Sequence, residues 1–144
     1  MRFTSETLAR VSVKDSVLPG LRGEIMRRTS EDYLKTIYVL SQKSGGVRGV
    51  SIAEELGVSR PTVSVIVRRL ETEGYITKNS DHEIYLTESG KEIAKSTLER
   101  HNTFEQLLTG LGVDKKIAAS DACRMEHAVS PESYEALKQL TEET

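Results

Sequence analysis

Apolar positions recur every three to four residues along most of the chain, and this period predicts a mainly helical protein. The first helix with a clear apolar stripe is expected after an N-cap at Thr29 or Ser30 and should end near Ser41. A glycine-containing loop follows, and then a short helix over residues 51–56 that Gly57 should close. The pattern thus opens with two helices separated by a loop.

A third helix is expected directly after this turn, because Ser59 is a suitable N-cap and Pro61 fits the first turn of a helix. Gly74 should end that helix. Residues 75–87 then alternate between apolar and polar positions around a polar turn, which predicts a two-stranded hairpin, the only β structure expected. Two short helices joined by a tight turn and followed by a hairpin predict a winged helix-turn-helix.

The remaining sequence is expected to be helical. Thr87 should cap a long helix over residues 88–108, Asp114 should cap the next helix, and Ser130 with Pro131 should begin the last one. The predicted fold class is therefore mostly α, with an N-terminal winged helix-turn-helix and a two-stranded β wing, followed by a helical domain.

Composition restricts the classes that fit this fold. The chain has 144 residues, 37% of them hydrophobic, which permits one compact domain or two small ones sharing a core. No apolar run approaches the roughly 18 residues of a membrane span, and the N-terminus does not have the form of a secretory signal. A single cysteine cannot form an internal disulfide, so a reducing cytoplasm is the expected location.

The net charge of −2 argues against nucleic acid as a partner, yet the charge is unevenly distributed. Basic residues exceed acidic ones in the first 30 residues and over 59–78, whereas acidic residues are in excess from residue 79 onward. A basic front and an acidic back suit a protein that offers one end to DNA.

The third helix and the wing supply the side chains expected to contact double-stranded DNA. Hydroxyls and arginines suit phosphates and base edges in a major groove, and the N-terminal amides of the helix favour a phosphate. The alternative that the winged helix serves only protein contacts stays open. The candidate DNA-binding residues are Ser59, Arg60, Pro61, Thr62, Ser64, Val65, Arg68 and Lys78.

The stretch CRMEH places Cys123, Glu126 and His127 at positions i, i+3 and i+4 of a predicted helix. One helical turn directs such side chains to the same small volume, and this spacing occurs in metal sites. The alternative is a half-buried thiol beside a solvated Glu-His pair. In the preceding long helix, His101 and Glu105 are polar where apolar residues are expected, and they could also form a buried hydrogen-bonded pair.

With these features placed, the chain resembles the diphtheria toxin repressor family of metal-dependent transcriptional repressors, which includes the manganese transport regulators. The resemblance covers about residues 29–140 and rests on TSEDYLKTIYVL, IAEELGVSRPTVSVIVRRLETEGYI, LTESGKEIA, ERHNTFEQLL and ACRMEHAVS. It implies a winged-helix DNA-binding domain over 27–90 and a helical metal-binding and dimerisation domain over 91–144. Residues 1–26 would form an extension of unknown role, and Met26 could itself be an initiator.

The resemblance also implies a ligand set for Fe²⁺ or Mn²⁺. Cys123, Glu126 and His127 match the family's ligand cluster, and Asp32 matches the ligand given by the first helix. His101 matches a histidine that binds metal in both main branches, and Glu105 matches a ligand of an ancillary site in the iron branch. The metal-binding residues implied are Asp32, His101, Glu105, Cys123, Glu126 and His127.

This sequence departs from the family pattern at several positions. Asp32 is typical of the manganese branch, whereas Cys123 is typical of the iron branch. Lys35 and Ala119 stand where the two branches have second-site ligands, so one functional ion per subunit is favoured. Lys35 is expected to point its ammonium at the pocket, the alternative being that it extends into solvent. The third, SH3-like domain of longer members is expected to be absent after Thr144.

The function that follows is a homodimeric, cytoplasmic, metal-dependent repressor that binds operator DNA and controls metal homeostasis genes, without a membrane or a small organic substrate as partner. One alternative is a winged-helix regulator that senses an organic ligand or thiol oxidation at Cys123 without metal. A small metalloenzyme is disfavoured, because no HExxH or comparable hydrolytic motif occurs.

Overall fold

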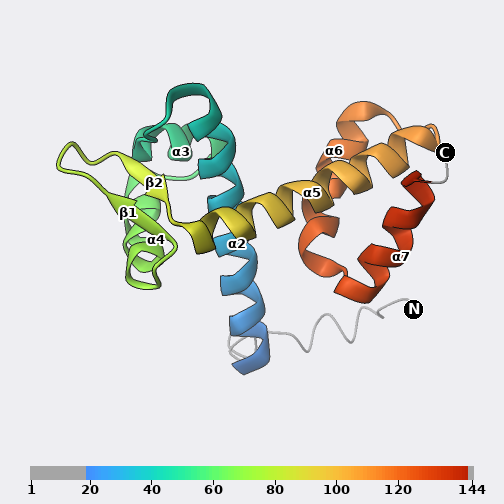
Figure 1. Cartoon of the computed structure of the whole chain (residues 1–144), viewed down its shortest axis with the longest axis horizontal. Helices are drawn as coiled ribbons and strands as arrows, with labels where there is room; N and C mark the ends of the chain where they lie inside the picture. The colour runs from blue at the N-terminus through green and yellow to red at the C-terminus, as the bar shows by residue number, and fades with distance from the viewer. Residues whose placement is uncertain (1–18, 143–144) are drawn as a thin grey trace.

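The structure is a computed structural model that describes residues 19–142, and most of the expected N-terminal extension over 1–26 lies outside these residues. The chain forms six helices and one hairpin across the described residues (Figure 1). In order, the elements are α2 (Pro19–Ser44), α3 (Gly49–Leu56), α4 (Arg60–Thr72), β1 (Ile76–Lys78), β2 (Ile84–Leu86), α5 (Glu88–Gly110), α6 (Lys115–Ala128) and α7 (Pro131–Glu142).

The first helix begins earlier than its sequence predicts. Thr29 and Ser30 do not cap it, because α2 already runs from Pro19. The Thr29 hydroxyl instead donates a hydrogen bond to the Ile25 carbonyl one turn back, at 2.9 Å, which is a mid-helix arrangement. Arg27 forms ion pairs with acidic residues one turn to either side, and such pairs support a helix. The predicted cap was therefore wrong, and α2 contains a segment assigned to the extension.

The helix-turn-helix is closed by the residues that its sequence indicates. Gly57 ends α3 with a φ of 67°, the left-handed conformation that glycine adopts readily. Ser59 caps α4, since its side chain accepts the Thr62 amide hydrogen at 3.3 Å, and Pro61 lies in the first turn. The core shared by α2, α3, α4 and the hairpin includes Leu34, Ile37, Val47, Ile52, Val63, Val67, Leu70, Ile76 and Ile84.

The wing is a short antiparallel hairpin in which Ile76 faces Leu86 and Lys78 faces Ile84. The Asn79 side chain accepts backbone amide hydrogens from Asp81 and Glu83, which closes the turn. Together with the two preceding helices, this hairpin confirms the predicted winged helix-turn-helix.

Helix α5 runs from the wing to the opposite end of the molecule, where α6 and α7 lie (Figure 1). It packs against both α2 and α6. Phe104 from α5, Ala122 from α6 and Tyr134 from α7 form a second, smaller core. The expected domain boundary at residue 90 falls in the first turn of this continuous helix and stays a prediction.

Gly90 allows the start of α5 to lie against the wing. A Cβ at this position would lie 2.1 Å from the Tyr75 carbonyl oxygen, so a larger residue would push α5 away. The predicted caps of the later helices are also confirmed, since Thr87 accepts the Gly90 amide hydrogen and Asp114 accepts that of Lys116. None of the helices within residues 19–142 is long and apolar enough to cross a membrane.

Candidate metal centre and DNA-contacting surface

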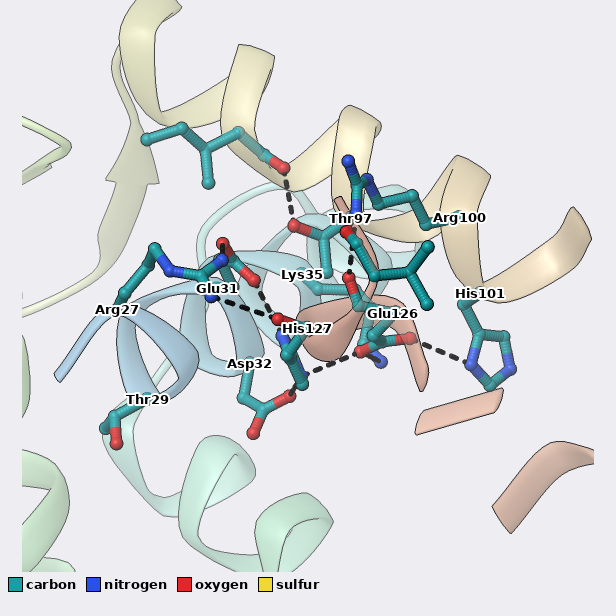
Figure 2. Close-up of polar contacts among 12 residues, drawn as sticks. Arg27, Thr29, Glu31, Asp32, Lys35, Thr97, Arg100, His101, Glu126 and His127 are labelled. Atoms are coloured by element: carbon teal, nitrogen blue, oxygen red, sulfur yellow. Dashed lines mark hydrogen bonds and ion pairs between the residues drawn. The ribbon is translucent and has the colours of Figure 1, made fainter. Parts of the chain in front are cut away.

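Potential metal ligands from three helices meet where α2, α5 and α6 converge (Figure 2). They form two groups of three, and within each group the donor atoms lie within 4.8 Å of one another. One group is His101, Cys123 and Glu126, and the other is Asp32, Glu126 and His127. The three CRMEH ligands therefore divide between two groups that share Glu126, and do not gather at one point by themselves.

Glu126 lies at the middle of the centre with a completely buried side chain. Its Oε1 accepts a hydrogen bond from the Lys35 ammonium at 2.5 Å and lies 3.2 Å from His127 Nε2. Its Oε2 lies 3.0 Å from His101 Nδ1. A buried carboxylate requires such compensation, because its loss of hydration is otherwise very costly.

His127 is equally enclosed, and both nitrogens of its ring have acidic partners. Nδ1 lies 2.6 Å from a Glu31 oxygen, and Nε2 lies 2.6 Å from an Asp32 oxygen. Burial alone would lower the pKa of His127, but the hydrogen bonds to Asp32, Glu126 and Glu31 together raise it to about 11. The alternative of a solvated Glu-His pair in CRMEH is therefore wrong, since both side chains are buried.

His101 and Glu105 form the hydrogen-bonded pair that their sequence positions allow. His101 Nε2 lies 3.1 Å from a Glu105 oxygen, while the other ring nitrogen faces Glu126. Glu105 belongs to neither group of three and reaches the centre only through His101. The geometry thus favours His101 over Glu105 as a ligand.

Cys123 stands at the solvent side of the centre. The residue is exposed, but its sulfur lies 3.6 Å from His101 Nδ1. Burial raises the pKa of this thiol, and the nearby Lys35 ammonium opposes that shift. The thiol is thus poised at the edge of the centre and would have to lose its proton to bind a metal.

Lys35 points into the centre, as its position on the same face of α2 as Asp32 predicts. Only 15% of its side chain is exposed, so the alternative that it extends into solvent is wrong. The side chain of Ala119, on α6, offers no donor atom to a metal.

Three residues around the centre have no counterpart among the predicted ligands. Arg27 donates to the His127 carbonyl at 3.0 Å, and Arg100 donates to the Val129 carbonyl at 2.6 Å. These arginines satisfy carbonyls at the C-terminal end of α6, which favours positive charge. The third residue is Glu31, whose carboxylate contacts the His127 ring. Arg27 was missed because the first helix was predicted to start after it. Glu31 was missed because successive residues of a helix point about 100° apart, so the position of Asp32 gave no reason to expect Glu31 at the centre.

The predicted DNA-contacting residues lie on the outer face of α4 and at the end of β1. Arg60, Ser64 and Lys78 line a groove of about 260 Å³ between α4 and the wing, together with His82. Among residues 19–142, no acidic side chain lines this groove. All eight predicted residues are exposed, namely Ser59, Arg60, Pro61, Thr62, Ser64, Val65, Arg68 and Lys78. The surface is chemically suited to phosphates and base edges.

The donors at the centre fit a divalent transition-metal ion. Carboxylate oxygens, imidazole nitrogens and a thiol sulfur are ligands for manganese, iron, cobalt and zinc. Asp32 on α2 and Glu126 and His127 on α6 place their donor atoms within 4.8 Å of one another, so the backbone need not move to bring them together. The arrangement is therefore a credible metal centre on its own chemistry.

Comparison with known proteins gives two family matches in sequence order. Residues 26–84 match the N-terminal DNA binding domain of iron dependent repressors, and residues 87–144 match their metal binding and dimerisation domain. Over 116 residues the chain is 39% identical to the transcriptional regulator MntR of Escherichia coli, a match that covers 81% of this chain and 75% of that protein.

Two further relatives are longer. The diphtheria toxin repressor of Corynebacterium diphtheriae is 38% identical over 105 residues, which cover 72% of this chain and 46% of that protein. A solved manganese-dependent transcriptional repressor in complex with manganese has a TM-score of 0.71 and 29% identity, covering 76% of this chain and 51% of the other. This chain thus spans about half the length of both. Because both family models match in order over most of the sequence, the protein belongs to the iron-dependent repressor family.

Proposed function

We propose that this protein is a metal-dependent transcriptional repressor that binds operator DNA as a homodimer and controls metal homeostasis genes, with Fe²⁺ or Mn²⁺ as its cofactor. The observation that carries the proposal is the donor group of Asp32, Glu126 and His127. It joins the helix at the base of the winged-helix core to the helix of the second core. The proposal includes no chemical turnover and places the protein in the cytoplasm with its DNA.

The shared donor group gives a route by which metal binding would affect the DNA-contacting surface. A divalent ion supplies a positive charge that ligands from both units can share, which favours one arrangement of the two units over others. Asp32 belongs to α2, whose buried residues pack on α3 and share one core with α4. A difference of a few kcal/mol between arrangements changes their populations widely, and about 5.5 kcal/mol moves a ratio of 1:99 to 99:1.

The homodimer rests on exposed apolar residues at the α5–α6 turn. Leu111 follows α5 and is 82% exposed, and Ile117 lies in the first turn of α6 and is 56% exposed. The turn between α5 and α6 is at the end of the molecule opposite the wing (Figure 1). A second copy packed there would cover them. A two-fold dimer would then present two α4 helices to half-sites separated by one turn of DNA, roughly 34 Å, or by a multiple of it.

We further propose that one functional ion binds per subunit. The two donor groups share Glu126, and the Lys35 ammonium already lies against that carboxylate. A fixed positive charge between the groups repels a second cation and neutralises part of the acidic charge in its place. Metal analysis of anaerobically purified protein should therefore give one ion per subunit.

The alternative of metal-free sensing through Cys123 is less well supported. A reactive thiol usually has a lowered pKa, whereas burial raises that of Cys123. Metal dependence of DNA binding separates the two functions directly.

The test uses a duplex selected from a random-sequence DNA library by the protein in the presence of Mn²⁺. Binding of that duplex is then measured by fluorescence anisotropy with Mn²⁺, with Fe²⁺ under anaerobic conditions, and with a chelator. We expect at least about 100-fold tighter binding with metal, and its loss in Asp32→Ala. Asp121→Ala is the matched control, since Asp121 also lies beside the ligands on α6 but pairs with Arg124. Equal binding with metal and with chelator would overturn the proposed function.

A further inference from the structure

We propose that Glu31 and Arg27 are positioning residues that fix the orientation of His127 and reserve its Nε2 for the metal. Neither is a ligand in this proposal. The inference rests on the proposed metal function and extends it to residues that belong to neither donor group.

The contacts around His127 form a closed ring of three residues (Figure 2). One Glu31 oxygen lies 2.6 Å from His127 Nδ1, and the other accepts from Arg27 Nη1 at 2.9 Å. Arg27 Nη2 then donates to the carbonyl oxygen of His127 itself at 3.0 Å. The imidazole is thus held by its ring and by its own backbone at the same time.

This ring of contacts assigns different tasks to the two imidazole nitrogens. A neutral imidazole has one nitrogen that carries hydrogen and one with a free lone pair. Both nitrogens face a carboxylate at 2.6 Å, but only Glu31 is also held by Arg27. Glu31 therefore keeps a hydrogen on Nδ1, whereas a metal bound by Asp32 would replace the hydrogen on Nε2. Nε2 faces Asp32 and Glu126, the other two members of its donor group. The geometry therefore predicts binding through Nε2.

Exposure ranks the two positioning residues. The Glu31 side chain is 17% exposed, so its bond to the buried imidazole is only weakly screened by water. The Arg27 side chain is 46% exposed, and its ion pairs contribute less. Glu31 should therefore matter more than Arg27, which acts by holding Glu31 in place.

The first test measures Mn²⁺ affinity by isothermal titration calorimetry on the full chain. Loss of a carboxylate partner behind a histidine ligand typically weakens metal binding about 10- to 100-fold, and we expect this for Glu31→Ala. Glu31→Gln keeps an acceptor oxygen and should retain most of the Mn²⁺ affinity. The affinity of Arg27→Ala should lie between those of Glu31→Ala and the unmodified protein. Glu24→Gln is the control, because Glu24 pairs with the same arginine but does not contact His127.

The second test reads the imidazole directly, which a merely structural role would not change. Long-range ¹H–¹⁵N NMR of protein loaded with diamagnetic Zn²⁺ should show His127 bound through Nε2 and protonated at Nδ1, and Glu31→Ala should mix the two tautomers. If Glu31→Ala does not fold, the spectrum of the unmodified protein and the Glu31→Gln affinity decide. Binding through Nδ1, or unchanged Mn²⁺ affinity in Glu31→Ala, would overturn this inference alone. If the unmodified protein bound no metal, the proposed function would fail instead.

Discussion

Replacing Lys35 by methionine should destabilise the metal-free protein and at the same time tighten metal binding. Methionine has a similar length but no charge, so Glu126 would keep its buried carboxylate and lose its ammonium partner. Removing one member of a buried ion pair costs roughly 3–5 kcal/mol. Because part of the Lys35 side chain is exposed and two histidines also contact Glu126, we expect about 2 kcal/mol here. For a chain of this size, that loss lowers Tm by roughly 6–10 °C.

The metal-bound protein should respond with the opposite sign. A divalent ion held by Glu126 experiences repulsion from the Lys35 ammonium, and the substitution removes it. Partial solvent screening reduces the effect to about 1.4–2.8 kcal/mol, which is about 10- to 100-fold in affinity. Thermal unfolding in chelator and calorimetric titration with Mn²⁺ measure the two changes, and Lys95→Met on the exposed face of α5 is the control. An unchanged Tm together with unchanged or weaker Mn²⁺ binding would refute this account of Lys35.

Three other predictions follow from the same contacts. Metal binding should strengthen by about tenfold per pH unit between pH 6.5 and 8, because the raised pKa of His127, about 11, means that the free protein must release this proton on binding. Calorimetry in buffers of different ionisation enthalpy should show about one proton released per metal ion, and no release would contradict the prediction. In titrations of DNA affinity against salt, Arg68→Ala should weaken binding to all duplexes and reduce the salt slope by about one charge. Thr62→Ala should instead change the sequence preferred in a repeated selection from random DNA. If both variants bind DNA as the unmodified protein does, α4 is not the helix that contacts the bases. Leu111→Glu should yield monomers in analytical ultracentrifugation at concentrations where the unmodified chain is dimeric, and an intact dimer would place the interface elsewhere.

The fold could be predicted from the sequence wherever a local chemical rule sets an element's end. Ser59, Gly57 and Thr87 act through their own backbone or nearest neighbours, and their roles as helix ends were correctly predicted. The start of α2 was wrong because Thr29 satisfies its hydroxyl inside a helix as readily as at a cap. Local preference alone does not distinguish these two uses of threonine.

The candidate site was predictable in composition but not in arrangement. Helical spacing predicted that Cys123, Glu126 and His127 share one volume, and the family resemblance added Asp32 and His101, whereas the structure divides the three CRMEH residues between two donor groups. That Glu126 is shared by two donor groups depends on how α2 and α5 approach α6, which no spacing along one helix encodes. The role of Glu31 was hidden for the same reason, since a histidine ring can contact two successive residues of a helix through its two nitrogens.

Helix α5 is a single lever between the two ends of the molecule. Its 23 residues extend over about 34 Å at 1.5 Å per residue, and the Gly90 contact seats one end directly against the wing. Gly90 lies 11 residues from His101, or about 16 Å along the helix, so a tilt of about 10° at His101 would move the Gly90 end by about 3 Å. One base step along DNA is about 3.4 Å, so an angular change of this size would displace the wing by nearly one nucleotide. The uninterrupted backbone of α5 would thus convert a change in packing at the metal centre into a change of register on the double helix.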